Sequence, residues 1–399
     1  MENYVAFIMG IALLGMVVDL LCKDYPKLQR QIYPIFFVAI YFLVVIRYYY
    51  GPDIWIYVHH YEEIELPPYD WKTVFELGYE HFCYWLHKLG VSYWGMTAII
   101  TTLYFAALAF LFHGLPNFRL FAFSSVFLLD YNLVFAENRQ CLAVAFFIFM
   151  VLCLQKKHYL FGLIFGAIAV TMHRSGFLPV GLTLLALTLY SQRQSAMTYN
   201  VLILILLFMM AIPVASIVNP LLPMLPFPSP IVASIKHHML LGRQFQIVAF
   251  IYLLVLVWMS IYTSKKRTTY GWIAIEVLIG LVIIVTTYQY YFLLNRLRSY
   301  FLPFILFYLT SVSVKSIEEQ TFRYAALIRQ GAAVLLILFG MHSTFKYIQG
   351  ARKLHAPIAR ACTLFDLRHA SPEQIRDRQM NIALKYWRED YMKNENNRL

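Results

Sequence analysis

Long apolar runs recur along almost the whole chain, and this pattern limits the fold more than any other feature of the sequence. A helix needs about 20 mostly apolar residues to cross a hydrocarbon layer about 30 Å thick. About twelve runs suit this length, and only 14% of the residues are charged, against roughly 25% in soluble domains. A soluble fold could not bury so much apolar surface. The sequence therefore predicts an all-α, polytopic integral membrane protein.

The predicted spans follow one another through most of the chain. In order, they cover residues 4–21, 32–49, 91–112, 120–135, 141–154, 159–172, 177–190, 201–218, 245–262, 271–288, 300–314 and 324–341. The first run has neither the basic flank nor the cleavage site of a signal peptide, so we expect it to be a retained span. We predict a multi-span catalytic domain over residues 1–345 and a basic tail over residues 346–399, with a surface helix beginning at Ser371.

Basic residues set the expected orientation, because Lys and Arg collect in cytoplasmic loops. Lys23, Lys27 and Arg30 follow the first run and place the N-terminus outside. Twelve spans would then place the tail outside despite its excess of basic residues, whereas one miscounted span would place it in the cytoplasm. The sequence leaves both options open.

The predicted outer ends of the spans carry polar clusters in which arginines are mixed with acids, histidines and aromatics. These clusters are residues 47–53, 76–81, 137–140, 173–175, 236–238 with Arg243, and 295–298. A transporter would more often carry its charges near the middle of the membrane, where they line a pathway. We therefore expect a site on one membrane face.

Two long outer loops, residues 50–90 and 219–244, have different characters. The spacing within residues 70–90 predicts a capped amphipathic helix on the membrane surface. Its expected apolar stripe is Phe75, Phe82, Trp85 and Leu89, with Glu76 and Glu80 stacked one turn apart on another face, where they present carboxylates to a site. The second loop is rich in proline, which excludes a continuous helix and suggests a lid or binding segment.

Arginines at span ends are the first candidate anion ligands. Arg47 precedes a Gly-Pro turn that would bring Asp53 back beside it, either as a partner or as a base. The alternative is a snorkelling arginine and a turn aspartate. Asn138 and Arg139 open a span, and a helix N-terminus favours a diphosphate. The alternative there is an arginine that simply ends a span.

Histidines are the second group of candidates. His173 beside Arg174 could hold a phosphate or transfer a proton, or it could be satisfied at the membrane interface. Arg296 and Arg298 point about 200° apart on a helix, so at most one is expected to face a site. The adjacent histidine pairs at residues 59–60 and 237–238 lack chelating spacing, so we predict no metal site.

Several short motifs occur in a recognisable order. They are Arg47 to Asp53 followed by Tyr57 and Tyr61, then Glu76-Leu-Gly-Tyr, then Asn138-Arg139-Gln-Cys-Leu-Ala143, then His173-Arg174-Ser175-Gly, and finally Asn295-Arg296 through to Tyr300. In this order the chain resembles the EpsG family, relatives of the Wzy-type O-antigen and exopolysaccharide polymerases. The resemblance is strongest over residues 32–179.

The resemblance implies a metal-independent, cofactor-free glycosyltransferase that joins undecaprenyl-diphosphate-linked oligosaccharides on the outer face of a bacterial cytoplasmic membrane. Its architecture would be similar to that of O-antigen ligases and C-type glycosyltransferases, and a chain-length regulator is an expected partner. The candidate diphosphate and sugar ligands are Arg47, Arg139, Arg174, Arg296, Tyr57 and Asn138. The candidate catalytic residues are Asp53, Glu76 and His173.

Two other functions remain as alternatives. A lipid-linked oligosaccharide flippase would spread its cationic groups through a central cavity, and a membrane O-acyltransferase would need a histidine deep in the membrane. The net charge of +12 does not indicate nucleic-acid binding, because membrane spans leave no solvated basic groove. Anionic lipid headgroups and diphosphates are the expected partners.

Overall fold

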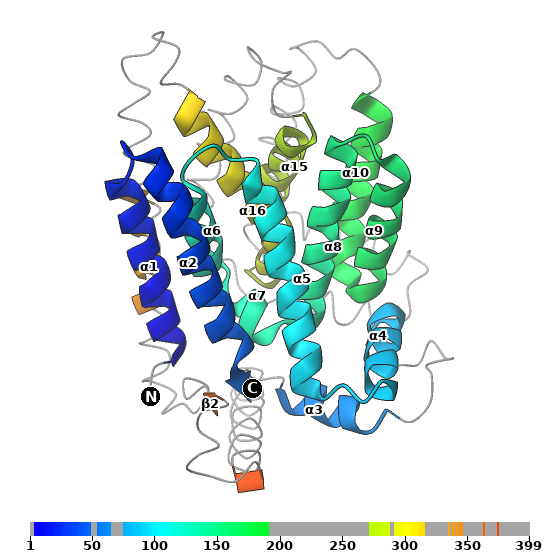
Figure 1. The fold of residues 1–399 in the computed structure, drawn as a ribbon. Coiled ribbons are helices and arrows are strands. Elements are labelled where there is room, and N and C mark those ends of the chain that lie inside the picture. Colours follow the sequence, from blue (N-terminus) through cyan, green and yellow to red (C-terminus); the bar gives the residue numbers. More distant parts are fainter. Residues whose placement is uncertain are drawn as a thin grey trace, which may run out of the picture. The chain divides into compact units, whose positions relative to one another are not determined.

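The computed structural model describes residues 4–48, 54–64, 75–190, 271–287 and 291–315, with short pieces of residues 334–345, 362–363 and 373–374 (Figure 1). This part of the chain is helical apart from one pair of two-residue strands. The predictions of spans at 201–218 and 245–262 and of a proline-rich loop at 219–244 lie outside the described residues, as do nearly all residues of the predicted tail helix.

The helices match the predicted spans in most places. They are α1 (Tyr4–Leu21), α2 (Pro26–Val45), α3 (Ile54–Glu62), α4 (Leu77–Lys88), α5 (Tyr93–His113), α6 (Arg119–Leu129), α7 (Tyr131–Ala136), α8 (Asn138–Gln155), α9 (Tyr159–Met172), α10 (Phe177–Tyr190), α15 (Gly271–Thr287) and α16 (Tyr291–Lys315). Among the described residues, α1, α2, α5 and α8 are long and apolar enough to cross a membrane. The prediction of a helical membrane protein is confirmed.

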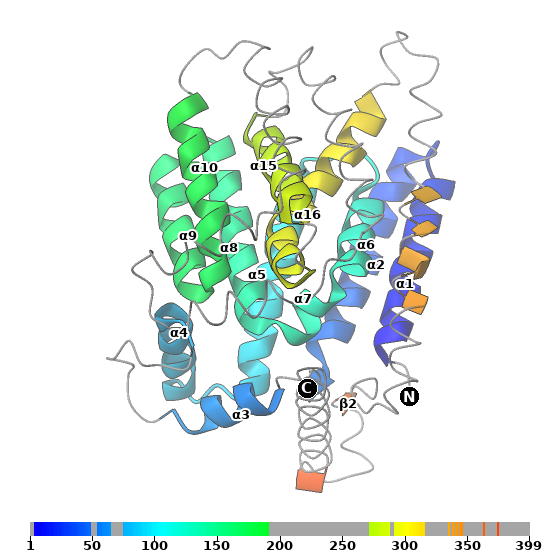
Figure 2. The same ribbon diagram turned by 180° about the vertical axis from the view of Figure 1, so that it is seen from behind.

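The described chain forms two compact units. The first contains residues 1–148, 171–174 and 309–399, and the second contains residues 149–170 and 175–308. In the first unit α1, α2, α5 and α6 lie side by side, as both ribbon views show (Figures 1 and 2). Phe37 joins α2 to its neighbours, with ring centroids 5.4 Å from Phe105 and 4.8 Å from Phe123.

A buried acid links α1 to the start of α6. Phe118, before the first turn of α6, has a left-handed backbone and provides no side-chain cap. Asp19 of α1 takes this role, because its Oδ2 accepts a hydrogen bond of 2.8 Å from the backbone N–H of Phe121. The first turn of a helix has N–H groups without partners inside the helix, and a carboxylate satisfies them well. This contact fixes α1 against α6.

The polar termini of the first unit gather at one end. There α2 ends, α3 and α4 lie beside the first turn of α5, and α8 begins (Figure 1). The Tyr61 hydroxyl donates to the carbonyl of Val91 at 2.7 Å, and Ser92 caps α5 by accepting from the N–H of Gly95 at 3.2 Å. The first contact fixes α3 to the segment that begins α5, and the second caps the first turn of α5.

The C-terminal tail reaches the same end. Strand β1 (Arg47–Tyr48) pairs antiparallel with β2 (Cys362–Thr363), with Arg47 opposite Thr363. The pairing places this part of the tail beside the end of α2, within the first unit.

Three predictions about the helices are wrong in detail. Residues 120–135 are not one span, because the chain breaks at Asp130 between α6 and α7. Helix α16 begins at Tyr291 instead of at Tyr300, so Arg296 lies within the helix instead of before it. Helix α4 begins at Leu77, with Glu76 as the residue before its first turn.

The face that α4 packs against the protein is not the predicted apolar stripe. The buried residues of α4 are Tyr79, Glu80 and Cys83, whereas Trp85 is 60% exposed and Leu89 75% exposed. The helix packs through a mixed face because Glu80 finds partners on α3 and in the segment before α4.

The second unit is held together by close helix contacts. A Cβ at Gly280 of α15 would lie 2.3 Å from Cβ of Phe301 of α16, so only glycine fits there. The Ser175 hydroxyl lies 3.2 Å from the hydroxyl of Tyr300. Small residues let the backbones of helices approach closely in membranes.

Candidate functional site

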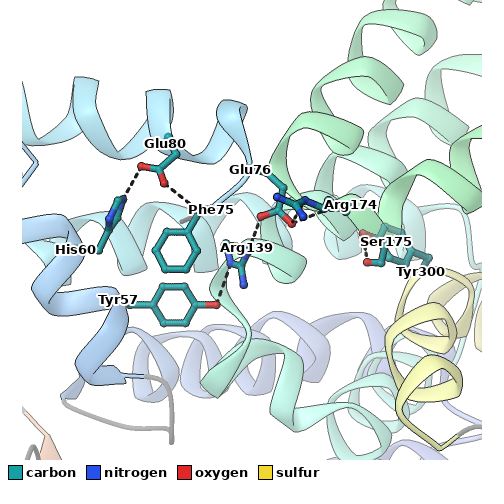
Figure 3. A network of polar contacts seen from close by, with 9 residues as sticks. All are labelled: Tyr57, His60, Phe75, Glu76, Glu80, Arg139, Arg174, Ser175 and Tyr300. Atoms are coloured by element: carbon teal, nitrogen blue, oxygen red, sulfur yellow. Dashed lines mark hydrogen bonds and ion pairs between the residues drawn. The ribbon is translucent and has the colours of Figure 1, made fainter. Parts of the chain in front are cut away.

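A partly buried ion pair forms the centre of the polar cluster in the first unit (Figure 3). Arg139, in the first turn of α8, pairs through Nη1 with Oε2 of Glu76, the residue before α4. The side chain of Glu76 is 9% exposed and that of Arg139 is 20% exposed. Removing one partner of a pair so shielded from water costs more than breaking a surface pair, because it leaves an uncompensated charge.

The other oxygen of Glu76 holds a second arginine. Its Oε1 accepts a hydrogen bond of 3.1 Å from the backbone N–H of Arg174 and lies 3.9 Å from Nε of the same residue. The Arg174 side chain is 64% exposed. One carboxylate therefore fixes the backbone of Arg174 while most of its guanidinium stays accessible.

Aromatic side chains position Arg139 from another side. Its Nε donates to the hydroxyl of Tyr57 at 3.2 Å, and its Cζ lies 4.5 Å from the ring centroid of Phe75. Tyr57 and Phe75 stack on each other at 5.3 Å. A cation over an aromatic face is stabilised by the ring quadrupole, so this arginine is fixed by a carboxylate, a hydroxyl and a ring.

A second polar network lies beside this cluster, around Arg47. Its guanidinium donates to Oγ1 of Thr101 at 2.9 Å, to the carbonyl of Val44 at 3.1 Å and to Oδ1 of Asn138 at 3.4 Å. Asn138 in turn donates to the hydroxyl of Tyr93 at 3.0 Å. Arg47 is 5% exposed, and burial lowers its pKa. In this arrangement Arg47 connects the end of α2 to the start of α8.

The family model described as the EpsG family matches residues 31–349. The match includes every element of the cluster, from the end of α2 to Arg174, and most of the described chain. The chain belongs to the EpsG family. No curated protein and no solved structure matches the chain. Membership in the EpsG family indicates a role like that of a polysaccharide polymerase, in a membrane protein.

The cluster unites several of the residues that the sequence predicts for this EpsG protein. Tyr57, Glu76, Arg139 and Arg174 are in direct contact in one network. His173 is buried and close enough to Glu76 for its charge to act on that carboxyl.

The other predicted residues lie elsewhere. Arg47 and Asn138 form the adjoining network. Arg296 is half-buried on α16, in the second unit, and Asp53 lies outside the described residues. The prediction that Glu76 and Glu80 present carboxylates on one face is wrong. Glu76 turns to the arginines, whereas Glu80 turns to His60, with its Oε2 2.6 Å from Nε2.

Some residues of the site escaped the sequence analysis. Phe75 was assigned to an apolar stripe, but it lies against the guanidinium of Arg139. Gly78 was quoted only as part of a motif, yet a Cβ there would lie 2.4 Å from Oγ1 and 2.8 Å from the carbonyl oxygen of Thr171. A glycine two residues after the acid Glu76, in the first turn of a helix, was the available signal.

The electrostatics of Glu76 follow from its partners. Burial alone would raise the pKa of this carboxyl, but the positive charges of Arg139 and His173 and the N–H of Arg174 outweigh burial, so that the pKa lies below its ordinary value of 4.5. Glu76 is therefore ionised at neutral pH. A carboxylate with a lowered pKa is a weak proton acceptor and a good anchor for cations.

This lowered pKa predicts how stability depends on pH. The ionised carboxylate stabilises the fold above the ordinary pKa of 4.5, and this contribution is lost as pH falls through the lowered value. We expect wild-type protein to unfold at a higher temperature than Glu76→Gln at neutral pH and to lose this advantage in acid. Thermal unfolding of both proteins from about pH 7 to about pH 3 measures the difference. A difference that stays constant over this range would contradict the assignment.

Proposed function

We propose that this protein is a polysaccharide polymerase that joins undecaprenyl-diphosphate-linked oligosaccharide units on the outer face of the membrane. The observation that supports this most is the pair of arginines, Arg139 and Arg174, ordered by one carboxylate with Arg174 largely exposed. Two guanidinium groups and one carboxylate leave a net positive charge. Arginine suits a diphosphate because its fork of N–H groups matches phosphate oxygens.

The two arginines would act on the leaving group. A hydroxyl of the acceptor unit attacks the anomeric carbon of the donor, the bond from that carbon to the diphosphate oxygen breaks, and undecaprenyl diphosphate leaves with the electron pair. Negative charge develops on the departing oxygen, where Arg174, supported by Arg139, would stabilise it. Tyr57 and Asn138 keep Arg139 and the start of α8 in place.

The attacking hydroxyl must lose a proton, and this requires a base. Glu76 is engaged by two arginines, so we assign it to positioning and keep Asp53 and His173 as the candidate bases. His173 directly precedes Arg174 in the chain, so His173 in its neutral form would place a proton acceptor next to the diphosphate ligand. Arg296 remains a candidate ligand. The chemistry requires no metal or other cofactor.

The proposed location of the cluster on the outer face of the membrane is argued from the two ends of α2. This helix of 20 residues begins beside Lys27, in the basic segment expected in the cytoplasm, and ends next to Arg47. Because α2 is long and apolar enough to cross a membrane, its two ends lie on opposite faces. The cluster at the Arg47 end would then face the exterior of a bacterial cytoplasmic membrane, within an architecture of about twelve spans.

A deletion strain of the host tests the proposal. Complementation with wild-type protein should restore long polysaccharide chains, and Arg174→Ala should shorten them, with a rate loss of about tenfold to a hundredfold, because hydrogen bonds to charged groups are worth about 1.5–3 kcal/mol. Arg174→Lys should be intermediate, since lysine offers a point charge without the fork. Gel analysis of the polysaccharide measures the chain length.

The same strain separates the alternatives. Arg30→Ala is the matched control, since Arg30 is an exposed arginine at the other end of α2 and should leave chain length unchanged. Chains of normal length that lack acyl groups in the deletion strain would indicate an acyltransferase. Lipid-linked units that accumulate on the cytoplasmic face would indicate a flippase. Either result would contradict the polymerase.

A further inference from the structure

A second carboxylate lies one helical turn after Glu76 and points to a different set of partners (Figure 3). The side chain of Glu80 is 3% exposed, and its Oε2 is 2.6 Å from Nε2 of His60 on α3. Its Oε1 accepts a hydrogen bond of 2.9 Å from the backbone N–H of Phe75. A buried carboxylate is costly unless it is paired and hydrogen-bonded. Here one oxygen accepts a hydrogen bond and the other lies against the His60 imidazole as an ion-pair contact.

Phe75 is the residue on which these contacts converge. The ring of His60 meets the Phe75 ring edge to face at 4.7 Å, and Tyr57 stacks on it at 5.3 Å. The guanidinium of Arg139 lies 4.5 Å from its ring centroid. Phe75 directly precedes Glu76, so any rotation of its backbone would also move the carboxylate that holds the two arginines.

We infer that Glu80 and His60 are positioning residues of the arginine site, which act through Phe75 to fix the Arg139 guanidinium and to aim the Glu76 carboxylate. The expected effect of these two residues on turnover rests on the proposed function, whereas their expected effect on the position of the Phe75 ring does not. Glu76 has no side-chain hydrogen bond that caps α4, so the contact from Glu80 back to the N–H of Phe75 restrains this segment at the helix start.

The test uses two substitutions that separate the contacts of Glu80. Glu80→Gln keeps an oxygen that can accept from the N–H of Phe75 but removes the charge beside His60, whereas Glu80→Ala removes both contacts. The matched control is Glu63→Gln on the neighbouring pair, because Glu63 and His59 lie 3.0 Å apart with side chains 64% and 58% exposed. Exposed pairs of this kind contribute little.

Two readouts are taken on the full chain in detergent. One is the ¹⁹F resonance of 4-fluorophenylalanine placed at Phe75, which reports the surroundings of the ring without any substrate. As a positive control, Arg139→Lys should move this resonance. The other is kcat/KM with a lipid-linked repeat unit. We expect Glu80→Ala to move the resonance and to lower kcat/KM about tenfold, about 1.4 kcal/mol. Glu80→Gln should change both less, and Glu63→Gln should change neither.

The outcomes distinguish this inference from the proposed function. An unmoved resonance in Glu80→Ala, or a moved resonance with unchanged kcat/KM in an active enzyme, would overturn the inference. An equal loss in Glu80→Gln and Glu80→Ala would also overturn it, because it would mean that the hydrogen bond to Phe75 is irrelevant. A wild type that makes no polymer, together with the expected shifts, would refute the proposed function and leave the positioning of Phe75 intact. If Glu80→Ala does not fold, the test rests on Glu80→Gln. A partial shift of the Phe75 resonance in Glu80→Gln supports the inference, and an unmoved resonance overturns it.

Discussion

Arg139→Ala is expected to reduce polymer formation more than any other single substitution in the cluster. It removes the buried partner of Glu76, the donor to the Tyr57 hydroxyl and the cation over Phe75. Breaking a fully buried pair by removing one partner costs about 3–5 kcal/mol. This pair is partly buried, so a loss of turnover of about a hundredfold is expected if this energy aligns the site. The rate of polymer formation by purified protein measures it.

Glu76→Gln and Arg30→Ala are the matched comparisons. Glu76→Gln keeps the shape of the side chain but removes its charge, so it should lose activity to a smaller extent than Arg139→Ala. Arg30→Ala removes an exposed arginine at the distant end of α2 and should be neutral. Normal turnover of a folded Arg139→Ala protein would show that this arginine is not part of the site.

Gly78→Ala is expected to lower the activity of the protein by displacing the start of α4. The new Cβ would lie 2.4 Å from Oγ1, 2.6 Å from Cβ and 2.8 Å from the carbonyl oxygen of Thr171. Because one of these atoms belongs to the backbone, the clash cannot be relieved by a side-chain rotation alone. Overpacking of this kind costs about 1–3 kcal/mol. Movement of α4 would pull Glu76 away from the N–H of Arg174, so the rate of polymer formation should fall at least about tenfold.

Gly10→Ala is the control for this substitution, since a Cβ at Gly10 in α1 meets no atom within 4 Å. Alanine favours a helix over glycine by about 1 kcal/mol, so Gly10→Ala should leave turnover unchanged and should not lower stability. Equal activity of Gly78→Ala and Gly10→Ala would contradict the view that the position of α4 sets the site.

Sequence periodicity predicted the long helices well where charged or turn residues bound them. Helix α1 has the predicted limits, residues 4–21, because its apolar run stops before Cys22 and Lys23. The break at Asp130 was missed, since a single acid inside an apolar run does not alter the hydropathy pattern enough to divide a span. The early start of α16 was missed for the opposite reason, because the polar residues Asn295, Arg296 and Arg298 end the apolar run but not the helix.

The composition of the cluster could be predicted better than its geometry. Motif order brought Tyr57, Glu76, Arg139 and Arg174 into one hypothesis, and the structure places them in contact. Sequence could not show that Glu76 and Glu80 diverge, because Glu76 lies outside the helix and the direction of its side chain depends on tertiary contacts. Nor could it show that Arg47 is buried among Thr101, Val44 and Asn138, since these partners are far apart in the chain.

The central claim is that the two arginines of this EpsG protein hold the diphosphate of a polymerase substrate. The most direct measurement incubates purified protein in nanodiscs with an undecaprenyl-diphosphate-linked repeat unit from its host and separates the products on a gel. The account predicts a ladder of lengths from wild-type protein, lost in Arg139→Ala and weakened in Arg174→Ala. Absence of a ladder from folded wild-type protein, with lipid-linked units crossing the membrane of proteoliposomes instead, would contradict it.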